Sequence, residues 1–409
     1  MLHPFIGATV LVAAVLASPV SAAPLTLQAA LDRAVQRSEA ARGARASLLS
    51  ASEAAQAAAQ LPDPTLRVGV ENLPVTGGDR FTTRDSMTMK RIGIGQEWLS
   101  RDKRDARQAA ADAVVNKEAV QARIAAAEAR LQTALAYLDA FYAGQALHLT
   151  TLMEHHAHEE YEAARGRLAS ATGGSEEVLK LAAARGMADD ESAELRQLQS
   201  TAAVALERWI GMPAGELDPV NSLPMPSESE YVANDPMVVS LRREIDVARG
   251  AAAVAASNRG PNWTWEVSYG QRTGYSDMVS VGVSIPLSVA PAARQDRETA
   301  SKLALASKAE ADLAEATRSA TADYLSVVSD VQRLQERISR YRNSVLVPAQ
   351  QRTASATAAY RSNQTSLTVL FEARHAEVDV QRKLLALQRD LAKREAQLTY
   401  RPIQAGGAP

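Results

Sequence analysis

Three histidines in one charged run are the residues of this sequence best suited to chemistry. His155, His156 and His158 lie between Glu154 and Glu160. Imidazole nitrogens are common ligands for divalent metals, and His155 and His158 share one face of a helix because they are three residues apart. Exposed helical histidines without a ligand are nevertheless more common than metal sites. We therefore expect no bound metal, and name these three histidines as the candidates if one binds.

The sequence predicts neither an enzyme nor a nucleic-acid-binding protein. It has no metalloprotease helix, no phosphate-binding loop and no nucleophile elbow. The formal net charge is -2, and no basic patch stands out that could bind nucleic acid. Cysteine is absent, which excludes disulfides, thiolate metal sites and a lipidated N-terminal cysteine. No cofactor is expected.

Two long helical arms, at 101–171 and 294–361, dominate the chain. In both, apolar residues recur at alternating steps of three and four, the pattern of a helix that pairs with other helices. The first seam runs through Val120, Ile124, Ala127, Leu131, Ala134, Leu138 and Phe141, and the second through Tyr324, Val327, Val331, Leu334, Ile338, Tyr341 and Val345. At about 1.5 Å per residue, such an arm spans on the order of 100 Å. This length excludes a compact globule.

Each arm follows a pair of predicted strands. Apolar and polar residues alternate over about 64–73 and 86–98 in the first half, and about 262–273 and 277–289 in the second. A lone hairpin is at best marginally stable in water. We therefore expect these strands to find partners outside their own hairpin.

The order of helix, strand pair, long helix, tip and returning helix occurs twice. The first repeat covers 23–214, a connector covers 215–234, and the second repeat covers 235–401. The tips are expected at about 172–175 and 361–366. A single helix is expected over 25–60, and the tail 402–409 is expected to be disordered.

Local signals mark several helix boundaries. Thr26 is the expected cap of the first helix, and Asp235, followed by proline, caps the helix that opens the second repeat. Pro348 should kink the second arm, because it removes one helical hydrogen bond.

Residues 1–22 have the features of a secretory signal peptide, with an apolar core over 5–16 and cleavage expected before Ala23. No later stretch reaches about 18 consecutive apolar residues, so a membrane crossing would have to use strands. Four strands are too few for a closed membrane barrel, which has at least about eight. Several chains would therefore have to contribute to one.

The duplicated plan resembles the TolC-like outer-membrane efflux channels over nearly the whole mature chain. The local matches are Pro62-Asp63-Pro64, Val70-Glu71-Asn72-Leu73, Gly95-Gln96-Glu97, Lys103-Arg104 and the stretch from Tyr360 to Ala373. The earlier matches resemble most closely the heavy-metal (CzcC/CusC-like) branch. This resemblance implies a mainly α fold with a β-barrel part, in which a homotrimer forms a 12-stranded outer-membrane barrel continued by a periplasmic α-helical coiled-coil tunnel.

The resemblance also implies partners and a place in the cell. A periplasmic adaptor (membrane fusion) protein and an inner-membrane RND pump would feed the channel, which would lie in outer-membrane lipid and extend into the periplasm. By position, Glu372, Glu176 and Glu177 are the candidates for a periplasmic gate, and a solvated helix-end charge is the alternative for each. The candidate adaptor-docking residues at the two tips are Thr172, Gly173, Gly174, Ser175, Asn363, Gln364, Thr365 and Ser366.

Two departures from the family pattern stand out at the second tip. Asn363 occupies a position where relatives commonly have glycine, and asparagine tolerates the left-handed conformation. Val369 replaces a carboxylate found in many relatives, which leaves Glu372 as the acid one turn later.

The function expected from the sequence is therefore a passive exit duct of a tripartite efflux system, with heavy-metal cations as the cargo. A drug-efflux or type I secretion duct is the alternative within the same fold. A soluble periplasmic coiled-coil scaffold is the alternative from another class.

Overall fold

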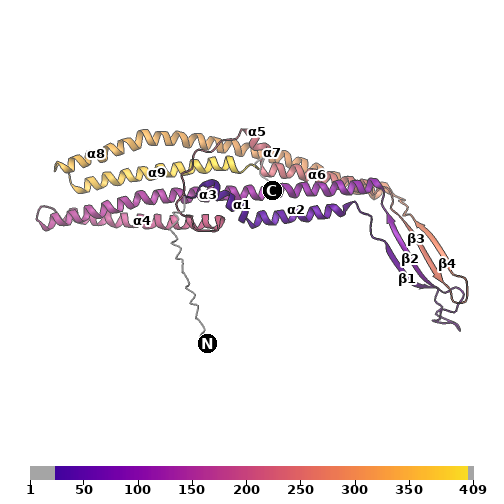
Figure 1. The fold of residues 1–409 in the computed structure, drawn as a ribbon. Helices are drawn as coiled ribbons and strands as arrows, with labels where there is room; N and C mark the ends of the chain where they lie inside the picture. The colour runs from indigo at the N-terminus through magenta and orange to yellow at the C-terminus, as the bar shows by residue number, and fades with distance from the viewer. Residues whose placement is uncertain (1–23, 404–409) are drawn as a thin grey trace, which may run out of the picture.

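A computed structural model describes residues 24–403 as a long helical body with a small sheet at one end (Figure 1). The predicted signal peptide lies outside the described residues, as does 404–409. In chain order the elements are α1 (Leu27–Arg37), α2 (Glu39–Ala58), β1 (Thr65–Glu71), β2 (Met89–Trp98), α3 (Arg101–Ala169), α4 (Ser175–Ile210), α5 (Glu228–Ala233), α6 (Pro236–Ser257), β3 (Trp263–Gln271), β4 (Met278–Ser284), the 3-10 turn η1 (Pro291–Ala293), α7 (Gln295–Arg340), the π-helical turn η2 (Tyr341–Leu346), α8 (Val347–Arg361) and α9 (Leu367–Tyr400). This mainly helical fold with a small sheet is the fold class predicted from the sequence.

The strands form one antiparallel sheet in the order β1-β2-β3-β4. Each predicted hairpin is present, and the two hairpins join through β2 and β3, whose register pairs Trp98 with Trp263 and Lys90 with Gln271. The strand expected over 277–289 is shorter in the structure, where β4 ends at Ser284. The expectation that each hairpin needs an outside partner is met, in part, by the other half of the same chain.

The helix predicted over 25–60 is interrupted at Ser38. The backbone of Ser38 is extended (φ -61°, ψ 112°), and its hydroxyl accepts a hydrogen bond from the amide of Ala41 at 3.2 Å. Ser38 therefore ends α1 and caps α2, because a serine at a helix start satisfies an amide that has no helical partner. The caps at Thr26 and Asp235 are as expected: Thr26 accepts from Ala29 at 3.2 Å, and Asp235 accepts from two amides of α6.

The second long arm contains a widened turn just before Pro348. Residues 341–346 form η2, and Pro348 is the second residue of α8. Proline has no amide hydrogen and crowds the carbonyl four residues earlier, here Ser344 within η2. A π turn bonds residues five apart, so it accommodates this missing donor without ending the helix. The disturbance expected at Pro348 thus takes the form of a π turn.

A buried tyrosine ties the connector to the first arm. The hydroxyl of Tyr137 donates toward the carbonyl oxygens of Leu25, at 2.5 Å, and Asp218, at 2.8 Å. Leu25 also pairs with Leu217 in a short parallel bridge. Burial raises the pKa of Tyr137 to about 12, with Asp218 adding to the shift, so the phenol remains a donor at neutral pH. The N-terminal end of the described chain is thereby fixed against α3.

The tail expected to be disordered is ordered at its first two residues. Pro402 and Ile403 are buried, and the amide of Ile403 donates to the carbonyl oxygen of Asn234 at 2.9 Å. This hydrogen bond and burial correct the expectation for 402–403. Among residues 24–403, no helix combines the length and apolar character needed to cross a bilayer.

Apolar side chains from both halves of the chain pack together near the tips, which lie at the end of the molecule opposite the sheet (Figure 1). The buried members come from α3, α4, α8 and α9, and they are Met153, Ala157, Ala164, Leu181, Ala188, Ala356, Leu367, Leu370, Phe371 and Ala373. Many of them are alanines, which allow close approach of the helices. The two helical pairs therefore share one core at this end.

Both tips end their long helix with the same backbone motif. Ala171 and Asn363 have left-handed φ values of 57° and 62°. Thr172 donates its amide to the carbonyl of Arg167 at 2.9 Å, and the equivalent amide at the second tip makes the same six-residue bond. This Schellman motif satisfies carbonyls that the helix end would leave free. Asn363 tolerates the conformation, as expected, whereas Ala171 adopts it without that advantage.

We expect Ala171→Gly to raise the free energy of unfolding by about 0.5–1 kcal/mol, because glycine has no Cβ to strain the left-handed conformation. Ala169→Gly is the matched control, since Ala169 is the last helical residue of α3 and glycine there should cost about 1 kcal/mol. Denaturant unfolding of the purified protein measures both. Equal destabilisation by the two variants would contradict the assignment of strain to Ala171.

Candidate functional site

The sheet has one apolar face that no part of the described chain covers. The register aligns the apolar residues of all four strands on this face, in rows that include Leu66–Ile94–Val267–Val281 and Val68–Ile92–Tyr269–Val279. All eight side chains are exposed; Val68 is 74% and Val281 is 73% accessible. A soluble sheet normally buries such a face against a core. Within residues 24–403, this face instead remains in contact with solvent.

The opposite face is polar and linked by charges across the strands. Arg67 pairs with Glu266 at 2.5 Å, and Arg91 pairs with Glu71 at 2.6 Å and with the hydroxyl of Ser268 at 2.7 Å. These side chains alternate along the strands with those of the apolar face, because successive residues of a strand point to opposite sides. The sheet is therefore built to separate a polar space from an apolar one.

The two outer strands of the sheet each keep a free edge. Within residues 24–403, β1 pairs only with β2, and β4 pairs only with β3. Backbone groups along such an edge are a ready template for another strand. Both edges are therefore open to pairing with further strands.

The sheet joins the helices through a pair of tryptophans. Trp98 and Trp263 face each other across β2 and β3, with ring centroids 6.0 Å apart. Tyr275 lies in the turn between β3 and β4, at the far end of the same hairpin. Aromatic side chains at both ends of an apolar band are typical of a membrane-facing sheet.

Two of the three gate candidates lie in one exposed cluster at the tips. Lys180 of α4 pairs with Glu176 at 2.7 Å, one helical turn earlier, and Glu372 of α9 lies close enough to contribute to the raised pKa of Lys180, after the hydrogen bond and charge of Glu176. The same hydrogen bond with Lys180 lowers the pKa of Glu176. Lys180 thus pairs directly with Glu176, and Glu372 adds a weaker interaction through its charge, so these three groups together carry a net negative charge. Lys180 was not expected from the sequence.

Glu177, the third gate candidate, is engaged within the subunit. Its carboxylate forms an ion pair with Arg167 at 2.7 Å and accepts a hydrogen bond from the amide of Leu367 at 3.1 Å. Leu367 is the first residue of α9, whose own cap, Ser366, makes no side-chain hydrogen bond to the helix. Glu177 therefore caps α9 from α4, a favourable place for a carboxylate. This role ties the first tip to the second.

A buried ion pair near the tips is a feature that sequence reasoning missed. Glu160 of α3 pairs with Arg374 of α9 at 2.6 Å, and the side chain of Glu160 is 5% exposed. Burial raises the pKa of Glu160 to about 7, although Arg374 opposes the shift. The available signal was the position of Glu160 on the apolar seam, between Ala157 and Ala164. Its partner is far along the chain and could not be identified from spacing.

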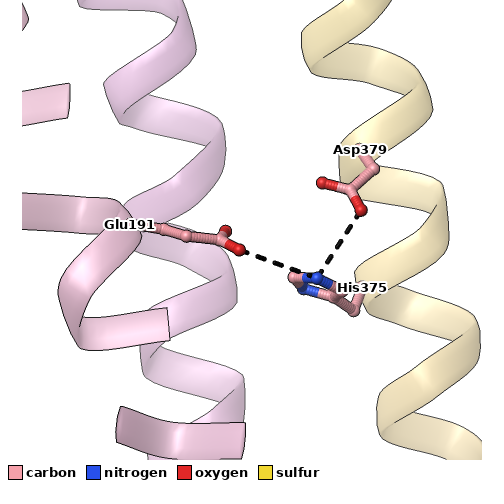
Figure 2. Close-up of side chains that lie close together, drawn as sticks. All are labelled: Glu191, His375 and Asp379. Carbon is pink, nitrogen blue, oxygen red and sulfur yellow. Dashed lines mark ion pairs between the residues drawn. The ribbon is translucent and has the colours of Figure 1, made fainter. Parts of the chain in front are cut away.

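The structure does not bring the three candidate histidines together into a metal site. His155 and His156 both lie beside Glu159, at 3.3 and 3.5 Å, while His158 is exposed. Within the described chain, no three potential ligands around them converge. Three others do: Glu191 of α4 with His375 and Asp379 of α9 place one ligand atom each within 4.8 Å of one another (Figure 2).

The expected docking residues surround the ends of the helical pairs. Thr172, Gly174, Ser175, Asn363, Gln364 and Ser366 are exposed, and Gly173 and Thr365 are half-buried. A side chain on Gly173 would bring its Cβ within 3.0 Å of the Cβ of Arg167. A side chain at this position would crowd the end of α3, so the packing of the tip itself favours glycine here.

We expect Glu160→Gln to change how stability depends on pH. The folded pKa of about 7 lies above the ordinary glutamate value of 4.5. Between these two pH values the folded protein keeps the proton on Glu160, whereas the unfolded chain releases it. The free energy of unfolding of the wild type therefore falls as pH rises from about 4.5 to 7. Relative to wild type, the variant should therefore gain on the order of 2 kcal/mol between pH 5 and pH 8. Unfolding at both pH values measures this difference, with the exposed Glu162→Gln as control. Parallel behaviour of wild type and Glu160→Gln would contradict the shift.

No protein-family model matches this chain, and no curated protein matches its sequence. Solved structures do match its fold. The outer membrane protein VceC from Vibrio cholerae has a TM-score of 0.75 and 18% identity, with 92% of this chain and 95% of that chain covered. The open state of the MtrE outer membrane channel from Neisseria gonorrhoeae has a TM-score of 0.77 and 17% identity, over 92% and 88%.

CusC, a protein that forms a transmembrane channel, has a TM-score of 0.73 and 13% identity, with 91% of this chain and 90% of that chain covered. These likenesses extend over nearly the full length of each protein, and they include both the sheet and the helical body. The chain described here therefore has the fold of the TolC-like outer-membrane channels.

Proposed function

We propose that this chain is the outer-membrane channel of a tripartite, RND-type efflux system. Three copies would contribute four strands each to a closed 12-stranded barrel, and their helices would form a tunnel that reaches through the periplasm. A periplasmic adaptor protein would bind the tips, and an inner-membrane pump would supply the cargo. In this role the chain is a passive duct rather than an enzyme.

The observation that carries this proposal is the uncovered apolar face of an open-edged sheet. In lipid, every backbone amide and carbonyl needs a partner within the protein, so only a closed barrel can place such a sheet in a membrane. Pairing of β1 with β4 of a neighbouring copy satisfies both edges at once. The ion pairs on the opposite face, such as Arg91–Glu71, then line the water-filled interior.

The negative cluster at the tips supports a cation-selective gate. In a threefold assembly, one acidic residue becomes a ring of three, and such rings favour cations at a constriction. Glu372 and Glu176 are the residues we propose for this ring. Glu177 takes part indirectly, by capping α9 at its first residue.

Heavy-metal cations are the cargo we propose. This assignment rests on the sequence resemblance to the CzcC/CusC-like branch, since the fold likeness to CusC, with a TM-score of 0.73, is close to that to MtrE, at 0.77. A drug-efflux or type I secretion duct is the alternative within the same fold. Deletion of this channel, followed by growth on zinc, copper and drug panels, separates these cargo classes.

The expected location distinguishes a channel from a periplasmic scaffold. We expect the full-length protein to fractionate with the outer membrane and to run as a trimer in mild detergent. In planar bilayers it should form conducting pores. Release with the soluble periplasmic contents as a monomer would overturn the proposal and favour the scaffold, because the sheet would then have to cover its own apolar face.

Two adjacent substitutions in β4 provide a matched test of the membrane face. Val281 lies on the apolar face and Ser280 on the polar one. We expect Val281→Arg to cost about 2–4 kcal/mol of membrane insertion and to deplete outer-membrane trimers, whereas Ser280→Arg is tolerated. The amount of trimer extracted from purified outer membranes measures both. An equal loss of trimers in both variants, or a loss with Ser280→Arg alone, would contradict the assignment of the two faces.

We expect Glu372→Ala to make the pore less cation-selective and its closed state less stable, because each trimer loses three negative charges at the tips. The reversal potential under a salt gradient should move toward zero, and single-channel conductance should rise. Glu53→Gln, an exposed acid of α2 far from the tips, is the control. Wild-type conductance and selectivity in Glu372→Ala would remove Glu372 from the gate.

A further inference from the structure

Two helices from different halves of the chain direct three potential metal ligands at one point. Glu191 projects from α4, while His375 and Asp379 lie one turn apart on α9 (Figure 2). All three are held by long helices rather than by loops. Glu191 and His375 are half-buried and Asp379 is exposed. Ligands on rigid elements have defined positions, which favours a site that exists before the ligand arrives.

The spacing of these groups fits a shared cation better than direct hydrogen bonds. The Nε2 atom of His375 lies 3.7 Å from Oε1 of Glu191 and 3.5 Å from Oδ2 of Asp379. Good hydrogen bonds to oxygen are about 2.7–3.2 Å long. Two ligands of a tetrahedral zinc ion, each about 2.0–2.2 Å from the metal, lie about 3.4 Å from each other. Both observed distances are close to this value.

The orientation of the imidazole is fixed by its surroundings. Phe371, one turn earlier on α9, stacks on the ring of His375, with centroids 5.7 Å apart and an interplanar angle of 13°. The Nδ1 atom is buried and has no hydrogen-bond partner among the described residues. Nε2 is the ring nitrogen that faces the two carboxylates, so it is the nitrogen placed to bind a metal.

Arg382 is the positive charge that directly contacts both carboxylates of the three-residue cluster. Arg382 of α9 donates to Oε2 of Glu191 at 3.0 Å and lies 3.7 Å from Oδ1 of Asp379. Each carboxylate thus uses one oxygen toward Arg382 and directs the other toward His375. With a neutral imidazole, the two carboxylates and one guanidinium leave a net charge of -1.

One of the three ligands, Asp379, is exposed at the surface. Asp379 and Arg382 line a groove of about 870 Å³ bordered by α3, α4 and α9. A fourth coordination position on the side of the groove would be available to water. An entry path and an open position are both expected of a site that exchanges its metal.

We propose that Glu191, His375 and Asp379 bind a divalent transition-metal cation, with zinc as the representative ion. One imidazole and two carboxylates suit zinc and its neighbours in the first transition series, while the nitrogen ligand disfavours calcium and magnesium. Binding would link α4 to α9 and so join the two halves of the chain above the tips. Zinc binding at this point depends neither on the cargo nor on the channel function proposed above.

Zinc titration of the full-length protein, purified in detergent without a polyhistidine tag, tests this site. We expect one zinc ion per chain by calorimetry, and a rise in melting temperature with zinc, since a ligand that binds only the folded state stabilises it. Cobalt(II) as a probe should give the visible absorption of a four-coordinate ion. His375→Ala should weaken zinc binding about 100-fold or more, because it removes the nitrogen ligand itself. Removal of an outer-shell partner typically weakens metal binding by about 10- to 100-fold.

Three further variants identify the residues that hold the zinc ion. The zinc affinity should be unchanged when His155, His156 and His158 are all changed to alanine. Glu191→Gln should lose zinc binding, although the glutamine side chain can still accept a hydrogen bond from Arg382. Arg382→Ala should bind zinc more tightly, because it removes the competing positive charge; a purely structural role of Arg382 predicts no gain.

Three results would overturn the proposal. They are no zinc binding by the wild type, unchanged affinity in both His375→Ala and Glu191→Gln, and loss of binding in the triple histidine variant alone. Trimer formation and circular dichroism of each variant verify folding, and if His375→Ala misfolds, Glu191→Gln decides. Because all of these readouts use purified protein, a failed zinc titration leaves the localisation and conductance tests of the channel unaffected.

Discussion

The unpaired edges of the four-stranded sheet are the constraint on which the rest of the structure depends. A sheet with one apolar face must hide that face, and a sheet with two free edges must close them. The described chain does neither for itself. Its opposite face is polar and carries ion pairs such as Arg67–Glu266, so this face needs contact with water. The assembly proposed above, with further copies in lipid, would satisfy all three features together.

At the opposite end, the molecule depends on contacts between its two halves. The buried pair Glu160–Arg374 joins α3 to α9, and Glu177 caps the first turn of α9 from α4. The first of these interactions places a carboxylate among buried apolar residues, and burial raises the pKa of Glu160. Breaking a buried ion pair by removing one partner is strongly destabilising, because it leaves an uncompensated buried charge. Such contacts are therefore suited to an end of the molecule that must hold a defined shape.

Local signals in the sequence were reliable where the physical cause was local. Asp235 caps its helix as expected, and Asn363 adopts the left-handed conformation that asparagine tolerates. The break at Ser38 was missed because the apolar pattern continues across it. A disturbance at Pro348 was expected, but its form as the π turn η2 was not, because a missing helical donor can be accommodated either by a kink or by a wider turn.

The sequence by itself determined the duplicated plan, the long helical seams and the alternation of the strands, because each follows from the period of apolar residues along the chain. Only the tertiary structure decided which charged groups meet. Glu191 and His375, like Glu160 and Arg374, belong to different halves of the chain, and no spacing in the sequence relates them. The candidate gate was likewise incomplete without Lys180. Contacts between distant segments depend on how the helices are set against one another in space, and periodicity along one chain does not contain that information.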